Sequence, residues 1–168
     1  MLKAYSKFLD KLEKIERVLL TLSMGVMTII IIYQVILRYI FNRSNSWSEE
    51  MARYLMVFST MTGAAIAVRR NSHLQIDVFI NYFKPQMKRV FTTIATLIGI
   101  GFLIYLLVYS IRLCGIGLTN NSAGIGIPMM IPYAFIPFGV VLMILASIEV
   151  ILKNINDFTQ HKTGEENS

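Results

Sequence analysis

The chain has 168 residues, of which 55% are hydrophobic, and a net charge of +6. The hydrophobic residues form four long apolar stretches, which a soluble domain would interrupt with surface charges at each turn, so the composition predicts an integral membrane protein. The basic residues flank these stretches instead of forming a patch with interleaved aromatic residues, which argues against nucleic-acid binding. Because Cys114 is the only cysteine, there is no internal disulfide and no cysteine-based metal site.

The apolar stretches predict an all-α integral membrane protein with four transmembrane helices, in one domain covering residues 1–168. A helix needs about 20 apolar residues to cross a bilayer core of about 30 Å. No titratable side chain lies at the middle of any stretch, whereas pumps and proton relays keep such groups within the membrane. We place the spans, in chain order, at residues 18–41, 47–68, 88–111 and 129–152.

Residues 3–17 carry too many charges to cross a membrane, but their apolar side chains recur every three or four residues. These side chains are Tyr5, Phe8, Leu9, Leu12 and Ile15. The spacing predicts an amphipathic helix that lies along the cytoplasmic headgroups. A plain helical extension of the first span is the alternative.

A cluster of polar residues opens the second span. Ser46 and Glu49 have the spacing of a capping box, in which each side chain bonds to the backbone amide of the other residue. Glu49 and Glu50 precede Arg53 by about one turn, so we expect them to pair with its guanidinium near the membrane interface. Trp47 fits the aromatic belt. These residues are interpreted as interface anchors and helix caps.

The second span also has a face of small residues, Ser59, Gly63 and Ala67, at four-residue spacing. Small residues let another helix approach closely. In lipid, this close packing stabilises helix association, because the hydrophobic effect does not. This pattern indicates an association face, used either within the chain or with a partner.

Arg69, Arg70 and His73 mark the end of the second helix, and an apolar segment at residues 73–84 follows. That segment is too short to span the bilayer, so we expect it to lie in the cytoplasmic interface. Twelve lysines and arginines fall in the N-terminal segment, this link and the C-terminal tail, against four on the other side. The bias predicts that both termini are cytoplasmic.

The link to the fourth span is rich in glycine and asparagine, and three prolines follow it: Pro128, Pro132 and Pro137. Interior prolines free backbone carbonyls, so the fourth helix should begin irregularly and sit against protein. Near its cytoplasmic end, we expect Glu149 to pair with Lys153 one turn later. Residues 157–168 are polar and are expected to form a mobile tail.

The inventory of side chains argues against an enzyme. The chain has no zincin motif, Walker loop, nucleophile elbow or Cys-x-x-Cys pair. Its two histidines, His73 and His161, lie outside the predicted spans, where they could not hold a haem between helices. We expect no cofactor in this chain. A self-contained small exporter would place a carboxylate deep in the first helix, and the first span has none.

Several segments together resemble the small membrane subunit of tripartite ATP-independent periplasmic (TRAP) transporters, the DctQ-like family. The order and spacing of these segments carry the resemblance, although Phe58 stands where an aromatic that is often tryptophan is expected. The segments are Ser46–Tyr54, Gly63–Arg69, His73–Asp77, Gly124–Pro128 and Tyr133–Gly139.

The resemblance implies a complex of three parts in the bacterial inner membrane. A periplasmic protein captures an organic acid, and a large membrane subunit binds the acid with sodium ions and moves it by an elevator-like motion. The small subunit packs against the large one as a static scaffold and helps to receive the loaded binding protein. Family substrates are carboxylates, including C4-dicarboxylates and sialic acid, and this chain looks most like the sialic acid members.

Within this scheme, we expect no residue of the chain to coordinate substrate. The residues singled out above would serve anchoring and subunit contact at one end of the second helix, association along it, and the cytoplasmic boundary at its other end. A membrane anchor or assembly subunit of an enzyme complex is the alternative from another functional class.

Overall fold

The chain folds into long α-helices in a computed structural model that describes residues 2–43, 45–71 and 85–165. The helices are α1 (Leu2–Ile40), α2 (Ser46–Asn71), α4 (Pro85–Gly117) and α5 (Met130–Glu165). Each of the four is long and apolar enough to cross a membrane, which confirms the predicted four-helix, all-α class. His73 and the predicted interfacial segment 73–84 lie outside the described residues.

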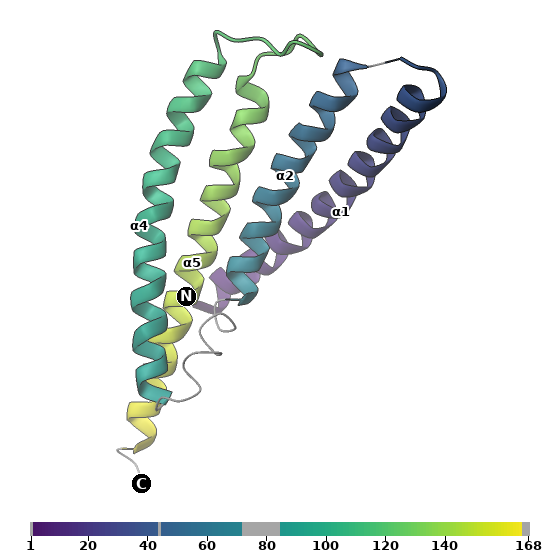
Figure 1. Cartoon of the computed structure of the whole chain (residues 1–168). Helices are drawn as coiled ribbons and strands as arrows, with labels where there is room; N and C mark the ends of the chain where they lie inside the picture. Colours follow the sequence, from purple (N-terminus) through teal and green to yellow (C-terminus); the bar gives the residue numbers. More distant parts are fainter. Residues whose placement is uncertain (1, 44, 72–84, 166–168) are drawn as a thin grey trace.

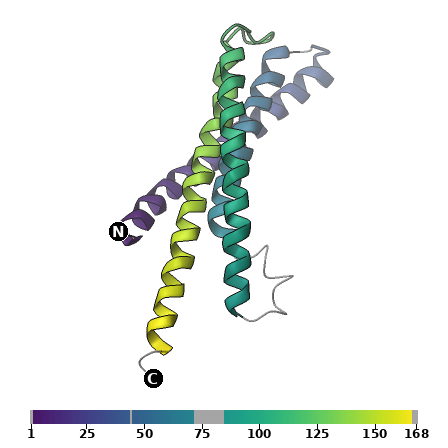
Figure 2. The same cartoon turned by 90° about the vertical axis from the view of Figure 1, so that its left-hand side faces the viewer.

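The helices stand side by side in the order α4, α5, α2, α1 (Figure 1). The view at right angles shows how strongly α1 is inclined to the others (Figure 2). Of the residues in the most apolar stretch of each helix, 44% are buried in α5, against 17% in α2 and 6% in α1 and α4. Both termini lie at the end of the bundle opposite the α1–α2 turn and the α4–α5 loop. That this end is cytoplasmic stays a prediction from the charge count.

A single helix, α1, contains both the predicted amphipathic segment 3–17 and the predicted span 18–41. Its 39 residues correspond to a length of about 58 Å at 1.5 Å per residue. The helix is continuous because no glycine or proline interrupts residues 2–22. That residues 3–17 lie along the cytoplasmic headgroups stays a prediction. The helix ends where Asn42 adopts a left-handed φ of 47°, and the Arg43 amide then donates to the Leu37 carbonyl at 3.2 Å.

The other helices also run past their predicted limits. In α4 the extension adds a few residues at each end of the span 88–111, and α2 continues three residues beyond 68. The largest difference is in α5, which continues from the predicted span 129–152 to Glu165. Most of the segment 157–168, expected to be a mobile tail, is therefore helical.

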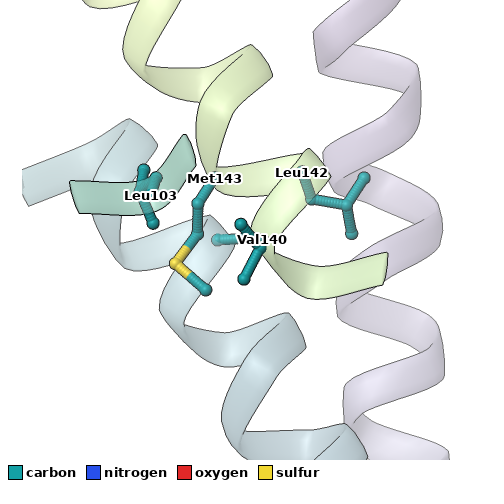
Figure 3. Close-up of a cluster of buried hydrophobic side chains, with 5 residues drawn as sticks. Leu103, Val140, Leu142 and Met143 are labelled. Carbon is teal, nitrogen blue, oxygen red and sulfur yellow. The ribbon is translucent and has the colours of Figure 1, made fainter. Parts of the chain in front are cut away.

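The apolar core is centred on α5. Val140 and Met143 from this helix are buried with Ala65 of α2 and Leu103 of α4, and Leu142, which belongs to the same cluster, points toward α1 (Figure 3). The apolar stretches of α1 and α4 are nearly as hydrophobic as that of α5 but far less buried, so the central position of α5 comes from the packing of the helices around it.

The closest approach of α2 and α5 depends on Gly139. A Cβ atom added there would lie 2.5 Å from the Cβ of Met61 and 3.2 Å from its backbone. Both contacts involve atoms next to or within the backbone, so no side-chain rotation could relieve them. The glycine therefore sets the distance between these two helices.

We predict that Gly139→Ala lowers the free energy of unfolding by about 1–3 kcal/mol, because overpacking forces the helices apart. The matched control is Gly101→Ala, since a Cβ added at Gly101 meets nothing within 4 Å. This control should leave stability unchanged or slightly raise it through helix propensity. Unfolding by sodium dodecyl sulfate in mixed micelles measures both. Equal effects of the two variants would contradict the packing argument.

Candidate functional site

Polar side chains gather at two places, one at each end of the bundle. The Arg69 cluster, formed by Arg69, Asp10, Glu13 and Glu149, lies at the end that carries the termini. The Glu50 site, formed by Glu50 and the α4–α5 loop, lies at the opposite end.

In the Arg69 cluster, one guanidinium from α2 binds carboxylates from two other helices. Arg69 Nε lies 2.6 Å from Glu149 Oε2 on α5, Nη1 lies 2.5 Å from Glu13 Oε2 on α1, and Nη2 lies 2.6 Å from Asp10 Oδ1 on α1. The side chains of Arg69 and Glu149 are only 9% and 1% exposed. All five N–H donors of an arginine lie in one plane, which suits it to such a junction better than lysine.

Further contacts extend the cluster outward. Arg69 also donates to the Leu9 carbonyl at 2.9 Å. Glu13 accepts from Arg70 Nε at 2.8 Å and from Arg17. Lys153 Nζ lies 2.8 Å from Glu149 Oε1, which confirms the predicted pair. Each of these two buried carboxylates therefore has more than one cation, as burial of charge requires.

The Arg69 cluster fixes the N-terminal part of α1 against α2 and α5. Tyr5 adds a direct α1–α5 contact, because its hydroxyl donates to the Leu145 carbonyl at 3.0 Å. We predicted Arg69 and Arg70 only as residues of the cytoplasmic boundary. The structure gives Arg69 a specific role as the junction of three helices.

At the other end, the carboxylate of Glu50 on α2 receives hydrogen bonds from the α4–α5 loop. It accepts from the Ser122 hydroxyl and from the Gly124 amide, the latter at 3.0 Å. Tyr54 donates to the same carboxylate from one turn further along α2 at 3.4 Å. A Cβ added at Gly124 would lie 2.8 Å from the Ser46 carbonyl oxygen, so the loop backbone touches the start of α2.

The loop itself is closed by backbone hydrogen bonds. The Ser122 amide donates to the Ile127 carbonyl at 2.8 Å, and the Met129 amide donates to the Asn120 carbonyl at 2.8 Å. Gly126 supplies the positive φ of 76° that the turn requires. The loop that precedes α5 is thus a folded unit whose inner side is bound to Glu50.

Two predictions about the start of α2 are wrong. Among residues 45–71, Arg53 has no ion pair with Glu49 or Glu50, because Glu50 points to the loop and Arg53 is exposed. No hydrogen bond joins Ser46 and Glu49 in that same range. The Ser48 hydroxyl instead donates to the Asn45 carbonyl at 3.0 Å.

The small-residue face of α2 packs against α1 within the chain. The hydroxyl oxygens of Ser59 and Ser23 lie 2.8 Å apart in a buried position. A Cβ added at Gly63 would be 3.9 Å from a methyl carbon of Leu20. Ala67, two turns beyond Ser59, is half-buried. Near the α1–α2 turn, the ring of Trp47 lies 6.1 Å from that of Tyr33, so this residue also contacts α1.

Sequence reasoning missed Asp10, Glu13 and Ser122. Both acids lie within the predicted amphipathic segment 3–17. A signal was available, because acids at residues 10, 13 and 149 and an arginine at 69 were all predicted at the same side of the membrane. Within the described ranges, no group of three or more histidine, cysteine, aspartate or glutamate side chains could hold a metal ion.

Residues 27–157 match the family model for the DctQ component of tripartite ATP-independent periplasmic transporters. The chain belongs to this family. It is 24% identical over 162 residues to the C4-dicarboxylate TRAP transporter small permease protein DctQ of Vibrio cholerae, a match covering 82% of this chain and 70% of that protein. The resemblance stated from the sequence is confirmed, and the family consists of transporter components and not enzymes.

Two other relatives concern sialic acid. The sialic acid TRAP transporter small permease protein SiaQ of Vibrio cholerae is 33% identical over 108 residues, which are 62% of this chain and 61% of that protein. The sialic acid TRAP transporter permease protein SiaT of Haemophilus influenzae is 40% identical over 63 residues, which are 38% of this chain but only 10% of SiaT. With its transporter relatives and four apolar helices, this DctQ-family chain is a multi-pass inner-membrane protein.

We predict that Arg69→Met lowers the free energy of unfolding by about 3–5 kcal/mol, because it leaves buried carboxylates without their main cation. Arg70→Met is the control, since Arg70 is 55% exposed and such a pair contributes about 0–1 kcal/mol. Denaturation of the purified chain in mixed micelles gives both values. Similar losses for the two variants would remove Arg69 from its proposed place as the junction.

We also predict that Glu50→Ala loosens the α4–α5 loop. Because the Gly124 amide loses the carboxylate that accepts its hydrogen bond, exchange of this amide hydrogen should accelerate. Glu49→Ala, at the exposed neighbouring position, should leave this exchange unchanged. Hydrogen exchange followed by mass spectrometry of loop peptides tests the difference, and an unaltered rate in Glu50→Ala would contradict it.

Proposed function

We propose that this chain is the small, scaffolding membrane subunit of a sodium-coupled TRAP transporter that takes up an organic acid. The match to the DctQ family over residues 27–157 carries the proposal. The distribution of charge supports it. The ionisable groups of the Arg69 cluster and the Glu50 site bind one another or the chain's own backbone, and Glu50 and Arg69 lie toward the two ends of α2.

The partner expected in the membrane is a large permease subunit. The relative SiaT is named a permease protein, and the segment that matches this chain makes up only one tenth of its length. A segment related to this chain is therefore covalently joined to a much longer polypeptide in that relative. This arrangement supports stable association of the present chain with a separate large subunit, which would bind the sodium ions and the substrate.

The substrate class is inferred from the relatives. Their names specify C4-dicarboxylates and sialic acid, which are all carboxylates. We assign recognition of the carboxylate to the partner chains, since the described ion pairs of this chain are internal contacts. The choice between the two substrate classes would then be made by the large subunit and the binding protein.

Rigidity is the property that a scaffold needs, and both polar sites supply it. The Arg69 cluster joins α1, α2 and α5 at one end, while Glu50 holds the α4–α5 loop at the other. If both termini are cytoplasmic, as the charge count predicts, the loop faces the periplasm. A folded loop with its inner side already bound is suited to meeting a periplasmic binding protein at low entropic cost.

We predict that uptake into proteoliposomes requires this chain, a large membrane subunit and a periplasmic binding protein together, with a sodium gradient. Omission of any one component should reduce uptake to background, because each supplies a separate step. Radiolabelled sialic acid and a C4-dicarboxylate are the substrates to compare. Transport by this chain without the other two would contradict the proposed function, as would uptake of equal rate when the chain is left out.

A further inference from the structure

We infer that the large membrane subunit packs against the outward strip of α2, formed by Arg53, Met56 and Thr60. This inference rests on the proposed function, because it names the surface through which the scaffold contacts its membrane partner. It commits α2 to the protein interface and leaves the exposed faces of α1 and α4 to lipid.

The contacts of α2 define which of its faces is free. Ser59 and Gly63 face α1, whereas Met61 approaches Gly139 of α5 and Ala65 lies in the core around α5. Residues three and four apart share one face of a helix. The outward strip follows that spacing, and each of its three members is exposed. It therefore lies on the side of α2 that neither neighbouring helix covers.

The chemistry of α2 differs from that of the other helices. Its most apolar stretch has a mean hydropathy of 1.3, against 2.2, 2.3 and 2.5 for α1, α4 and α5. The exposed faces of α1 and α4 present large apolar side chains, such as Ile29 at 68%, Ile98 at 69% and Phe102 at 62% exposure. Such faces suit hydrocarbon chains. The outward strip places a guanidinium and a hydroxyl where lipid would otherwise lie.

Arg53 is the most informative residue of the outward strip, because its charge has no partner among the described residues. It lies seven residues into α2, about 10 Å along the axis from Ser46, and it has no ion pair within residues 45–71 or with any other described residue. The nearby carboxylate of Glu50 is occupied by Ser122 and Gly124. An intramembrane arginine is costly unless paired, and no described residue pairs with Arg53, so we assign its partner to the large subunit.

Lipid phosphate is the competing partner, since an arginine side chain can extend toward the headgroups. It would account for Arg53 but not for the low hydropathy of α2, which is 1.3 over its most apolar stretch against at least 2.2 in the other three helices. Thr60 alone does not decide, because Thr28 of α1 is exposed and hydrogen-bonded in the same way. A helix that combines an unpaired arginine with low hydropathy suits contact with protein better than contact with hydrocarbon chains. We therefore assign the strip to the large subunit, with a carboxylate or carbonyl group facing Arg53.

The test uses the complete complex, with an affinity tag on the large subunit. Thr60→Trp should reduce the amount of this chain recovered with the tagged subunit at least tenfold, because indole would hold the two proteins apart. The matched control is Thr28→Trp on α1. Thr28 is also exposed and donates its hydroxyl to the carbonyl four residues earlier, at 2.9 Å, as Thr60 does at 2.8 Å. Its variant should assemble as the wild type does.

A second measurement does not depend on disrupting the fold. A benzophenone attached to Met56→Cys, in a Cys114→Ser background, should crosslink to the large subunit on illumination. The same probe at Leu97→Cys, an exposed position of α4, should label lipid. Crosslinking from α4 but not from α2, or wild-type assembly of Thr60→Trp, would overturn the inference while leaving the proposed function standing. If none of the wild-type chain is recovered with the tagged large subunit, the proposed function itself fails.

Discussion

The arrangement of the helices depends on the ion pairs that Arg69 makes with carboxylates on α1 and α5. Its guanidinium reaches carboxylates on α1 and α5 from its own position on α2, in a place where the side chain is almost completely covered. Without it, α1 would contact the rest of the bundle through the Tyr5 hydroxyl, the buried Ser23–Ser59 contact and apolar side chains. A buried charge network of this kind is weak evidence for high stability, because desolvation offsets much of the attraction. It does favour one geometry, since Arg69 reaches carboxylates on α1 and α5 at the same time.

Glu50 has a corresponding role for the connection between α4 and α5. A loop of this length has many accessible conformations, and ordering them costs conformational entropy. The carboxylate offsets that cost by accepting hydrogen bonds from the loop, while Gly124 and Gly126 allow the close approach and the turn. The two ends of the bundle are therefore held by different chemistry. One uses ion pairs between helices, and the other uses a single acid on a helix to organise a loop.

These two sites leave the middle of the protein uncharged and tightly packed, with α5 at the centre and Gly139 setting its distance from α2. A rigid body of this kind can support a neighbouring subunit that moves during transport. The faces of the helices divide this work further. Small residues of α2 are used within the chain against α1, whereas the polar residues on its other side are left for a partner. In this respect α2 contributes to both the internal and the external contacts of the scaffold.

Much of this organisation could be predicted from local patterns. The four spans, their order and the family follow from hydrophobic runs and short motifs, because a bilayer demands about 20 apolar residues wherever a helix crosses it. The Glu149–Lys153 pair follows from one helical turn of spacing. The predicted pairing of Arg53 was wrong because it considered only neighbours along α2. The α4–α5 loop brings the donors of Ser122 and Gly124 to the carboxylate of Glu50 instead.

The sequence by itself determined that this protein crosses the membrane four times, keeps its charges away from the middle of the bilayer and belongs with the DctQ family. Only the tertiary structure decided which charges meet. Asp10, Glu13 and Glu149 are distant from Arg69 along the chain, and the loop residues that bind Glu50 are more than 70 residues away from it. Such contacts depend on the rotation and tilt of whole helices, which the packing of side chains between them fixes and which no local spacing records.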